Sequence, residues 1–306
     1  MFEQFIEKLQ DPKRSYITLE TTPKHDANFT PVIDTVEKLG IYDKVDGFST
    51  TDNPLAKLKF NSIIAAMLLQ QRFKKPVLAT MSMRDRNKIA LQSDLLGANN
   101  IDVRTILALT GDPAKISDQP SAKGVYESDS TMLLDIIKCF NAGIDYAGRE
   151  FNIKPNPIYP FAVSNAYAKN PKTLLKKFTK KLEHGAVGII TQPIFDKENA
   201  KMLLEIFEEA KQITNSSKGT LIIGIFPITR LKTAQFLASH VPGIHVPKGW
   251  IDKLYEANQK GSAEEEKIGL ELSKKIYEDI KEIHPKIHLM TANRFKLAKQ
   301  ILFNEP

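Results

Sequence analysis

The feature that most constrains this chain is an alternation, repeated eight times, of a short apolar run and a longer helical stretch. The sequence predicts strands at residues 15–19, 45–50, 76–81, 104–109, 158–164, 187–191, 220–226 and 287–290. Between them, apolar residues recur at the three- and four-residue spacing of amphipathic helices. The predicted helices include 28–39, with Thr30 as a candidate cap, 85–96, ending at Gly97, and 130–141, ending at Gly143. A helix at 229–239 is expected to follow the seventh strand, and a long helical region to reach residue 283. Strands that alternate with helices run parallel, so the pattern predicts a parallel sheet.

Eight such units in 306 residues match a (β/α)8 TIM barrel, whose usual size is about 250 residues before insertions. We therefore expect a single barrel domain over residues 1–306, with an N-terminal helix and an insertion at residues 242–249 before the eighth strand. A doubly wound open sheet is the alternative. No Gly-x-Gly-x-x-Gly follows the first strand, which disfavours a Rossmann dinucleotide site.

Composition narrows the class of protein further. Hydrophobic residues make up 42% and charged residues 26% of the chain, and Cys139 is its single cysteine. An internal disulfide and a cysteine-rich metal site are therefore excluded. No apolar run approaches the ~20 residues of a membrane span, and residues 1–12 lack the apolar core of a signal peptide. We expect a cytoplasmic protein with no membrane partner.

The net charge of +7 and the pI near 9.2 raise the question of nucleic acid. The lysines, however, are spread over helical stretches such as 172–181 and 260–281, and no aromatic-plus-basic strand motif of an RNA-binding sheet occurs. A solvated basic surface, or attraction to anionic small molecules, explains the charge better. We expect no nucleic-acid partner.

The strand at 105–109 ends in Thr110, Gly111 and Asp112, followed by a proline. Glycine permits a sharp turn or a close approach to a ligand, and proline ends the ladder of hydrogen bonds. Asp112 would thus sit at the carboxyl end of a core strand, where α/β proteins place their chemistry. The alternative is a solvated carboxylate in a loop.

Other strand ends carry Glu20, Gln192 and Arg294. Two carboxylates can divide acid and base roles if their surroundings separate their pKa values. The apolar neighbours Ile17 and Leu19 should raise the pKa of Glu20 and make it the proton donor, while Asp112 stays ionised. The amide of Gln192 suits a heterocycle. No strand end offers Cys or His, so no metal is expected. The alternative for each residue is a polar group on the barrel rim.

Several segments, in order along the chain, resemble the methylenetetrahydrofolate reductase family. They are RDRN at 84–87, IALQSDLLGA at 89–98, ILALTGDP at 106–113, AKGVYESDS at 122–130, GIITQPIFD at 188–196, GIFPI at 224–228 and FLASHVPG at 236–243. The pattern resembles in particular the branch that also occurs fused to a homocysteine S-methyltransferase domain.

The resemblance implies an activity in one-carbon metabolism, on the route to methionine. The family reduces 5,10-methylenetetrahydrofolate to 5-methyltetrahydrofolate, with FAD at the mouth of a barrel and NADH or NADPH as the electron donor. By position, Glu20 is the acid that helps open the substrate ring, and Asp112 stabilises the cationic iminium that results. Gln192 contacts the folate and the nicotinamide in turn.

The resemblance also assigns binding residues. Those expected to bind FAD are Thr51, Asn53, Thr80, Thr110, Gly111, Asp112, Tyr126, Glu127, Ser128, Asp129, Ser164, Asn165 and Lys181. Those expected on the folate side are Asp112, Gln192, Thr233, Leu237 and Arg294. Lys181 would hold the diphosphate, since a fixed positive charge suits it; the alternative is a solvated helix lysine.

A second function stays open at this point. The chain is alternatively a non-catalytic or partner-dependent folate-binding barrel, a subunit of a methyl-transfer or electron-transfer complex. Members of the family usually self-associate, so we expect a homo-oligomer, with or without a partner subunit.

Overall fold

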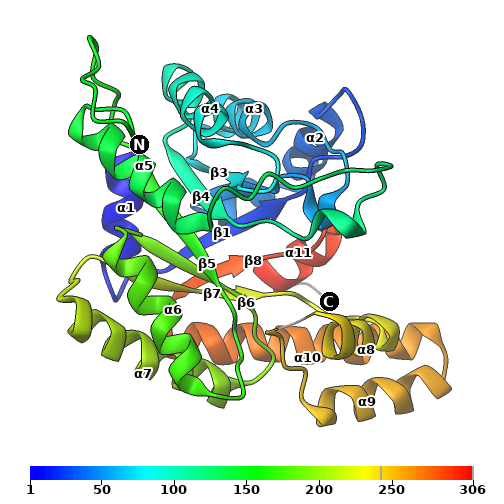
Figure 1. The fold of residues 1–306 in the computed structure, drawn as a ribbon. Helices are drawn as coiled ribbons and strands as arrows, with labels where there is room; N and C mark the ends of the chain where they lie inside the picture. The colour runs from blue at the N-terminus through cyan, green and yellow to red at the C-terminus, as the bar shows by residue number, and fades with distance from the viewer. Residues whose placement is uncertain (242, 305–306) are drawn as a thin grey trace.

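The computed structural model describes residues 1–241 and 243–304, and its centre is a closed barrel of parallel strands (Figure 1). Each strand pairs with the next in sequence, and the last pairs with the first. The strands are β1 (Tyr16–Thr21), β2 (Gly47–Thr50), β3 (Val77–Ser82), β4 (Thr105–Leu109), β5 (Tyr159–Ser164), β6 (Gly188–Pro193), β7 (Thr220–Ile225) and β8 (Lys286–Leu289). The expected (β/α)8 barrel is confirmed.

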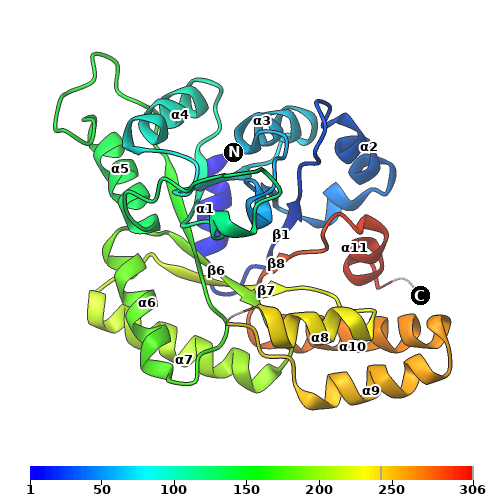
Figure 2. The same ribbon diagram turned by 45° about the vertical axis from the view of Figure 1, so that its right-hand side comes forward.

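Helices surround the barrel, as the two views in Figures 1 and 2 show. They are α1 (Phe2–Gln10), α2 (Thr30–Lys38), α3 (Ser62–Phe73), α4 (Lys88–Asn100), α5 (Ser130–Ala142), α6 (Pro171–Glu183), α7 (Lys197–Thr214), α8 (Leu231–His240), α9 (Lys248–Gln259), α10 (Ser262–Ile283) and α11 (Phe295–Leu302). Short 3-10 turns occur at η1 (Ile41–Lys44), η2 (Pro54–Ala56) and η3 (Ala114–Ile116). The main core lies between strands and helices.

Helix α1 closes the amino-terminal end of the barrel. Its Phe5 ring lies 4.9 Å from the ring of Tyr16 and 6.5 Å from that of Phe161, inside a separate apolar cluster. The buried Lys286 at the start of β8 donates hydrogen bonds from Nζ to the carbonyls of Lys8, Asp11 and Arg14 at 2.5–2.7 Å. This end is therefore plugged, and ligands have access from the carboxyl ends of the strands.

The segment between β7 and β8 differs from the sequence-based expectation. A helix at 229–239 was expected to follow the seventh strand as its partner, with one long helical region to residue 283. Instead α10 contacts both α7 and α11, whereas α8 packs mainly on α9. Gly261, at φ +117°, separates α9 from α10. Of the three helices between β7 and β8, α10 is thus the one that belongs to the ring around the barrel, and α8 and α9 are additional to it. The expected insertion at 242–249 includes α9's first residues, and residue 242 lies outside the described part of the chain.

Two helix-boundary expectations are also wrong. Gly97 was expected to end the fourth helix, but α4 continues to Asn100 because Ala98 and Asn99 are buried and the Ala98 carbonyl accepts from the Val103 N–H. Thr30 was expected to cap α2. It is instead the first helical residue, and its N–H donates to the side chain of Asn28 at 2.9 Å. Among the described residues, no helix is long and apolar enough to cross a membrane.

Candidate active site

A cavity of about 530 Å³ opens at the carboxyl ends of β2, β4, β5 and β6. Its volume lies in the range of small-molecule sites, ~300–1,000 Å³. Of the residues expected to bind FAD or folate, it is lined by Thr51, Thr110, Gly111, Asp112, Asp129, Ser164, Asn165, Lys181 and Gln192. Loops far apart in the sequence therefore supply one site, as the barrel topology predicts.

Gly111 is at a position where only glycine fits. Its φ is +92°, and a Cβ there would lie 2.9 Å from Cβ of Arg84 and 3.2 Å from Cβ of Ser82. A side chain would both strain the backbone and collide with the end of β3. The chain can therefore turn tightly after β4 and direct Asp112 to the cavity.

Asp112 is held by two neighbouring loops. Its carboxylate accepts a 2.7 Å hydrogen bond from the N–H of Leu55, and its carbonyl accepts one of 2.6 Å from the hydroxyl of Tyr126. Asn53, Leu55 and Ala56 all have positive φ angles. Such backbone is costly for residues other than glycine, so the Leu55–Asp112 bond helps to stabilise the loop that walls the cavity.

Charged residues that sequence reasoning did not single out support this wall. Arg84 is 3% exposed and donates to both carboxylate oxygens of Asp85, at 2.7 and 2.6 Å, and to the carbonyl of Asn53. The buried Asp52 accepts from the Ser82 N–H and from Arg86 at 2.6 Å. Both arginines lie in the RDRN segment at 84–87, so the resemblance to the family already pointed to this segment.

The start of helix α5 and lysines of α6 form another wall of the cavity. Helix α5 begins there, and Asp129 caps it by accepting from the N–H of Thr131 at 2.9 Å. Lys180 pairs with Asp129 at 2.7 Å, and Lys181 donates to the Ser130 hydroxyl at 3.0 Å. Burial would raise the pKa of Asp129, but hydrogen bonds from Lys180 and Thr131 lower it; burial lowers the pKa of Lys181 to about 8. A helix N-terminus with several lysines suits a phosphate group.

Lys177 and Lys180 also line the cavity and were not anticipated. Their spacing on α6, three residues apart, places them on one face of the helix with Lys181. This periodicity was available in the sequence. What the sequence lacked was the direction of that face, which the packing of Leu174, Phe178 and Leu182 on the core decides.

Gln192 lies in a network that includes the loop after α8. The Asn165 amide donates to Gln192 Oε1 at 3.2 Å, and Lys177 donates to Asn165. Gly243 packs directly on this pair, since a Cβ there would lie 1.8 Å from Asn165 Nδ2 and 2.5 Å from Gln192 Oε1. The Gly243 carbonyl also accepts from the N–H groups of Ala166 and Tyr167. The inserted segment therefore contributes to the site.

Glu20 is half-buried at the end of β1 and is not among the residues that line the cavity. Burial raises the pKa of its carboxyl to about 7, and its side chain accepts no hydrogen bond from the described residues. The raised pKa was expected, but its cause is different. Leu19 packs outward against helices, whereas Glu20 faces inward beside its register partner Ser49, so the barrel interior desolvates it.

A buried histidine, His288, lies inside the barrel between Thr18 and Ser49, the latter being the register partner of Glu20. His288 Nδ1 is 2.7 Å from Thr18 Oγ1, and its Nε2 is 3.4 Å from Ser49 Oγ. Burial lowers the pKa of His288 to about 4, so the ring is neutral at physiological pH. This histidine was not singled out from the sequence, although it lies within the predicted eighth strand at 287–290.

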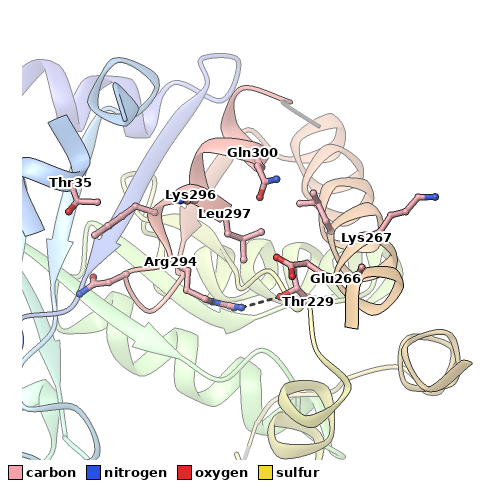
Figure 3. Close-up of a pocket in the computed structure, with 12 residues that line it drawn as sticks. Thr35, Thr229, Glu266, Lys267, Arg294, Lys296, Leu297 and Gln300 are labelled. Carbon is pink, nitrogen blue, oxygen red and sulfur yellow. Dashed lines mark hydrogen bonds between the residues drawn. The ribbon is translucent and has the colours of Figure 1, made fainter. Parts of the chain in front are cut away.

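Arg294 belongs to a different cavity, of about 750 Å³, between α10, α11 and the end of β7 (Figure 3). Its guanidinium donates to Thr229 Oγ1 at 3.2 Å and to the Pro227 carbonyl at 2.9 Å. It also lies over the Phe226 ring, 5.6 Å from the centroid. Other expected site residues outside the first cavity are Asn53, Thr80, Tyr126, Glu127, Ser128, Thr233 and Leu237.

Buried hydroxyls at the carboxyl ends of β2, β3 and β5 are a further feature of the first cavity. The buried Oγ atoms of Thr51 and Ser164, both lining residues, and of Ser82 have no hydrogen-bond partner in the described chain. Buried polar groups are normally satisfied, so these atoms point to a polar ligand. No group of three His, Cys, Asp or Glu side chains that could hold a metal ion occurs within residues 1–241 and 243–304.

Comparison of the fold with solved structures finds related barrels at low sequence identity. A protein from Clostridium thermocellum that binds two copies of 5-methyl-5,6,7,8-tetrahydrofolic acid is 15% identical, with 99% of each chain covered and a TM-score of 0.60. DmoA from Hyphomicrobium sulfonivorans is 9% identical over 94% of this chain and 86% of its own, with a TM-score of 0.56. An F420-dependent secondary alcohol dehydrogenase is 13% identical, with 95% of this chain and 99% of its own covered and a TM-score of 0.58.

These likenesses concern the fold. No curated protein matches the chain. The sequence model described as methylenetetrahydrofolate reductase, in contrast, matches residues 5–305, nearly the full length and including every strand of the barrel. The chain belongs to the methylenetetrahydrofolate reductase family.

Proposed function

We propose that this protein reduces 5,10-methylenetetrahydrofolate to 5-methyltetrahydrofolate, with FAD in the cavity at the barrel mouth. The observation that carries the proposal is the placement of Asp112 and Gln192 in one cavity together with an anion-binding helix terminus. Family membership supplies the reaction class. The electron donor is NADH, NADPH or a partner protein.

The protein's own residues supply charge and protons. With a pKa near 7, Glu20 is partly protonated at neutral pH and can donate a proton to the substrate amine. Asp112, held by Leu55, supplies a fixed negative charge to a cationic iminium. Gln192 offers both a donor and an acceptor to the heterocycle once Asn165 releases its Oε1.

The residues that line the cavity fit a flavin dinucleotide. Lys181, Lys180 and the first turn of α5 would hold the diphosphate, and Thr51, Ser164 and Gly111 would lie along the remaining part of the cofactor. Tyr126 and Asn53 do not line the cavity and would act by holding its loops in place. Arg84 lines the cavity and holds the loop after β2 through the carbonyl of Asn53. When bound, FAD supplies the hydride for the substrate.

Folate as the ligand is further supported by the fold neighbour from Clostridium thermocellum, which binds a methylated tetrahydrofolate. The same neighbour keeps a second candidate open, a barrel that binds folate without reducing it. In favour of this second function, Gln192 is already engaged by Asn165 and covered by Gly243. We also propose a cytoplasmic location and membership of the branch found fused to a homocysteine S-methyltransferase domain.

The decisive experiment is an anaerobic absorbance titration of the purified protein reconstituted with FAD. We expect a flavin spectrum that NADH or NADPH bleaches and that methylenetetrahydrofolate restores. A protein that binds folate by calorimetry but never takes up FAD would be the non-catalytic barrel. If reduction requires a protein donor, chemically reduced flavin would still be reoxidised by methylenetetrahydrofolate.

A further inference from the structure

The backbone around Gln192 is fixed by contacts between β6 and β7. Strand β6 is irregular between Ile190 and Pro193, where its register with β7 shifts. Thr191 holds this irregularity in place, because its hydroxyl accepts a hydrogen bond from the Gly224 N–H at 2.9 Å. A Cβ at Gly224 would lie 2.2 Å from the Thr191 carbonyl, so the two strands are in close contact here. Irregularities of this kind re-aim the side chains beside them, and Gln192 lines the cavity.

What remains to be set is which end of the Gln192 amide faces a ligand. The terminal torsion of a glutamine side chain has two nearly equivalent orientations, which differ by the exchange of Oε1 and Nε2. One orientation presents an acceptor to the cavity, and the other presents a donor. The choice therefore depends on the groups that the amide meets on its protein side.

Asn165 is the group on the protein side, and backbone contacts fix its position as well. The two residues that follow it, Ala166 and Tyr167, donate their N–H groups to the Gly243 carbonyl at 3.1 and 3.0 Å. Asn165 Nδ2 donates to Gln192 Oε1 at 3.2 Å. Gln192 Nε2 has no hydrogen-bond partner within residues 1–241 and 243–304. Gln192 therefore directs its acceptor at the protein and keeps its donor for a ligand.

Lys177 decides the orientation of the Asn165 amide. Its Nζ donates to Asn165 Oδ1 from helix α6. An ammonium group carries donors and no acceptor, so the Asn165 amide must turn its oxygen toward Lys177 and its nitrogen toward Gln192. An Asn165 amide turned the other way would set two donors against each other. The hydrogen-bonding polarity thus passes from Lys177 through Asn165 to Gln192.

The direction of Lys177 follows from the packing of α6. Leu174, Phe178 and Leu182 bury the inner face of the helix, and Lys177 lines the cavity. The adjacent Lys176 lines a separate groove between α6 and α7 instead. Because the two lysines carry the same charge one residue apart, Lys176 is a matched control for the position of the ammonium group.

We propose that Lys177 is a positioning residue that fixes the hydrogen-bonding polarity of Gln192. Gln192 then meets the ligand as an N–H donor, so the ligand edge opposite it must be an acceptor, either a carbonyl oxygen or an unprotonated ring nitrogen. A donor that is shut off from water and left unpaired costs binding free energy, so the site rejects ligands that lack this acceptor. That the ligand is a folate rests on the proposed function, whereas the polarity of the two amides does not.

Nuclear magnetic resonance of the side-chain amides in the ligand-free full chain tests the polarity directly. In the wild type, one Asn165 Nδ2 proton should be shifted downfield by its hydrogen bond to Gln192, and neither Gln192 Nε2 proton should be. In Lys177→Met both amides should populate both orientations, so part of this shift should move to a Gln192 proton. Lys177→Arg, which also only donates, and Lys176→Met should resemble the wild type. Wild-type amide spectra in Lys177→Met would overturn the proposal.

Calorimetry with 5-methyltetrahydrofolate extends the test to the ligand. Lys177→Met should weaken binding by about 3- to 10-fold, the cost of a charged hydrogen bond in an exposed position. In a Gln192→Leu background the same change should cost little, because no amide is left to orient. Equal losses in both backgrounds would mean that Lys177 only attracts the ligand by its charge, which would overturn the positioning role. A wild type that binds no folate but shows the expected amide polarity would refute the proposed function and support the role of Lys177.

Discussion

The N–H of Leu55 donates a 2.7 Å hydrogen bond to the carboxylate of Asp112, joining the loop after β2 to the end of β4. Leu55 adopts φ +56°, which costs a non-glycine residue ~1–2 kcal/mol. The aspartate therefore holds this loop, and in the proposed function it has a second task, to present charge to the cavity. The two tasks can be separated experimentally.

Asp112→Asn should remove the charge but keep the acceptor for Leu55. We expect folate reduction to fall by about 100-fold or more, as for loss of other electrostatic stabilisers, with little change in melting temperature. Asp112→Ala should in addition loosen residues 53–57, which hydrogen exchange would detect. If Asp112→Asn reduces folate at the wild-type rate, the carboxylate is only a loop anchor.

Glu20→Gln should separate catalysis from stability. Reoxidation of reduced flavin by methylenetetrahydrofolate should fall by ~10²–10⁴-fold, the usual range for a lost general acid, while flavin reduction by nicotinamide persists. Equal loss of both half-reactions would contradict the acid role.

The same variant has a predicted pH signature. The folded pKa of Glu20, about 7, lies above its ordinary value of 4.5, so the unfolded chain holds fewer protons between these values and stability falls as pH rises from 4.5 to 7. Glu20→Gln should therefore stabilise the protein more at pH 8 than at pH 5, by at most about 3 kcal/mol. Urea unfolding at the two pH values measures this. A gain independent of pH would show that Glu20 is not desolvated.

His288 should produce the opposite pH dependence. Its folded pKa, about 4, is below the ordinary 6.5, so the neutral ring contributes stability above pH 6.5 that is lost as pH falls toward 4. In His288→Gln, which keeps polar contacts to Thr18 and Ser49, this acid-induced loss should disappear. Nuclear magnetic resonance of the ring proton would report the pKa directly, and a value near 6.5 would contradict burial.

Lys181→Met should weaken FAD binding by about 10-fold or more, the cost of one charge-assisted hydrogen bond. Lys176→Met, on the same helix but lining a different surface groove, is the control and should bind FAD normally. Because the pKa of Lys181 is about 8, wild-type affinity should also decline between pH 7 and pH 9. Fluorescence quenching of FAD measures both, and an unchanged dissociation constant would make Lys181 a structural residue.

Gly243→Ala should disturb the site through backbone and packing. Its φ is +85°, and the added Cβ would overlap Asn165 and Gln192. We expect at least about a 10-fold weaker affinity for methyltetrahydrofolate by calorimetry. Gly249→Ala, in α9 with nothing within 4 Å, should be neutral or stabilising, by ~0.5–1 kcal/mol. Equal affinity in the two variants would show that the loop does not shape the folate site.

Much of the architecture could be predicted because its signals are local. The apolar run at 105–109 is β4 as expected, and Gly143 ends α5 at a left-handed φ of +91°. Local signals fail where a distant contact outweighs them. Gly97 has the residue type of a helix end, yet the burial of the following residues keeps it within α4.

The same holds for the candidate site, where the sequence predicts the position of a residue along a strand but not the direction of every side chain. Residues expected at the ends of β4, β5 and β6, namely Asp112, Asn165 and Gln192, do line one cavity. Arg294 was expected on the folate side but lines the neighbouring cavity, because the conformation of the loop after β8 turns it toward Thr229. No sequence pattern encodes that direction.

By itself, then, the sequence determined the alternation of strands and helices, the closed parallel barrel and the polar residues at its mouth. These follow from side-chain periodicity and turn chemistry, which act over a few residues. Only the tertiary structure decided that α10 completes the ring, that Gly243 covers Gln192 and that the interior of the barrel desolvates Glu20 and His288. Those outcomes depend on contacts between segments up to 270 residues apart, where packing and burial, not local propensity, set the energies.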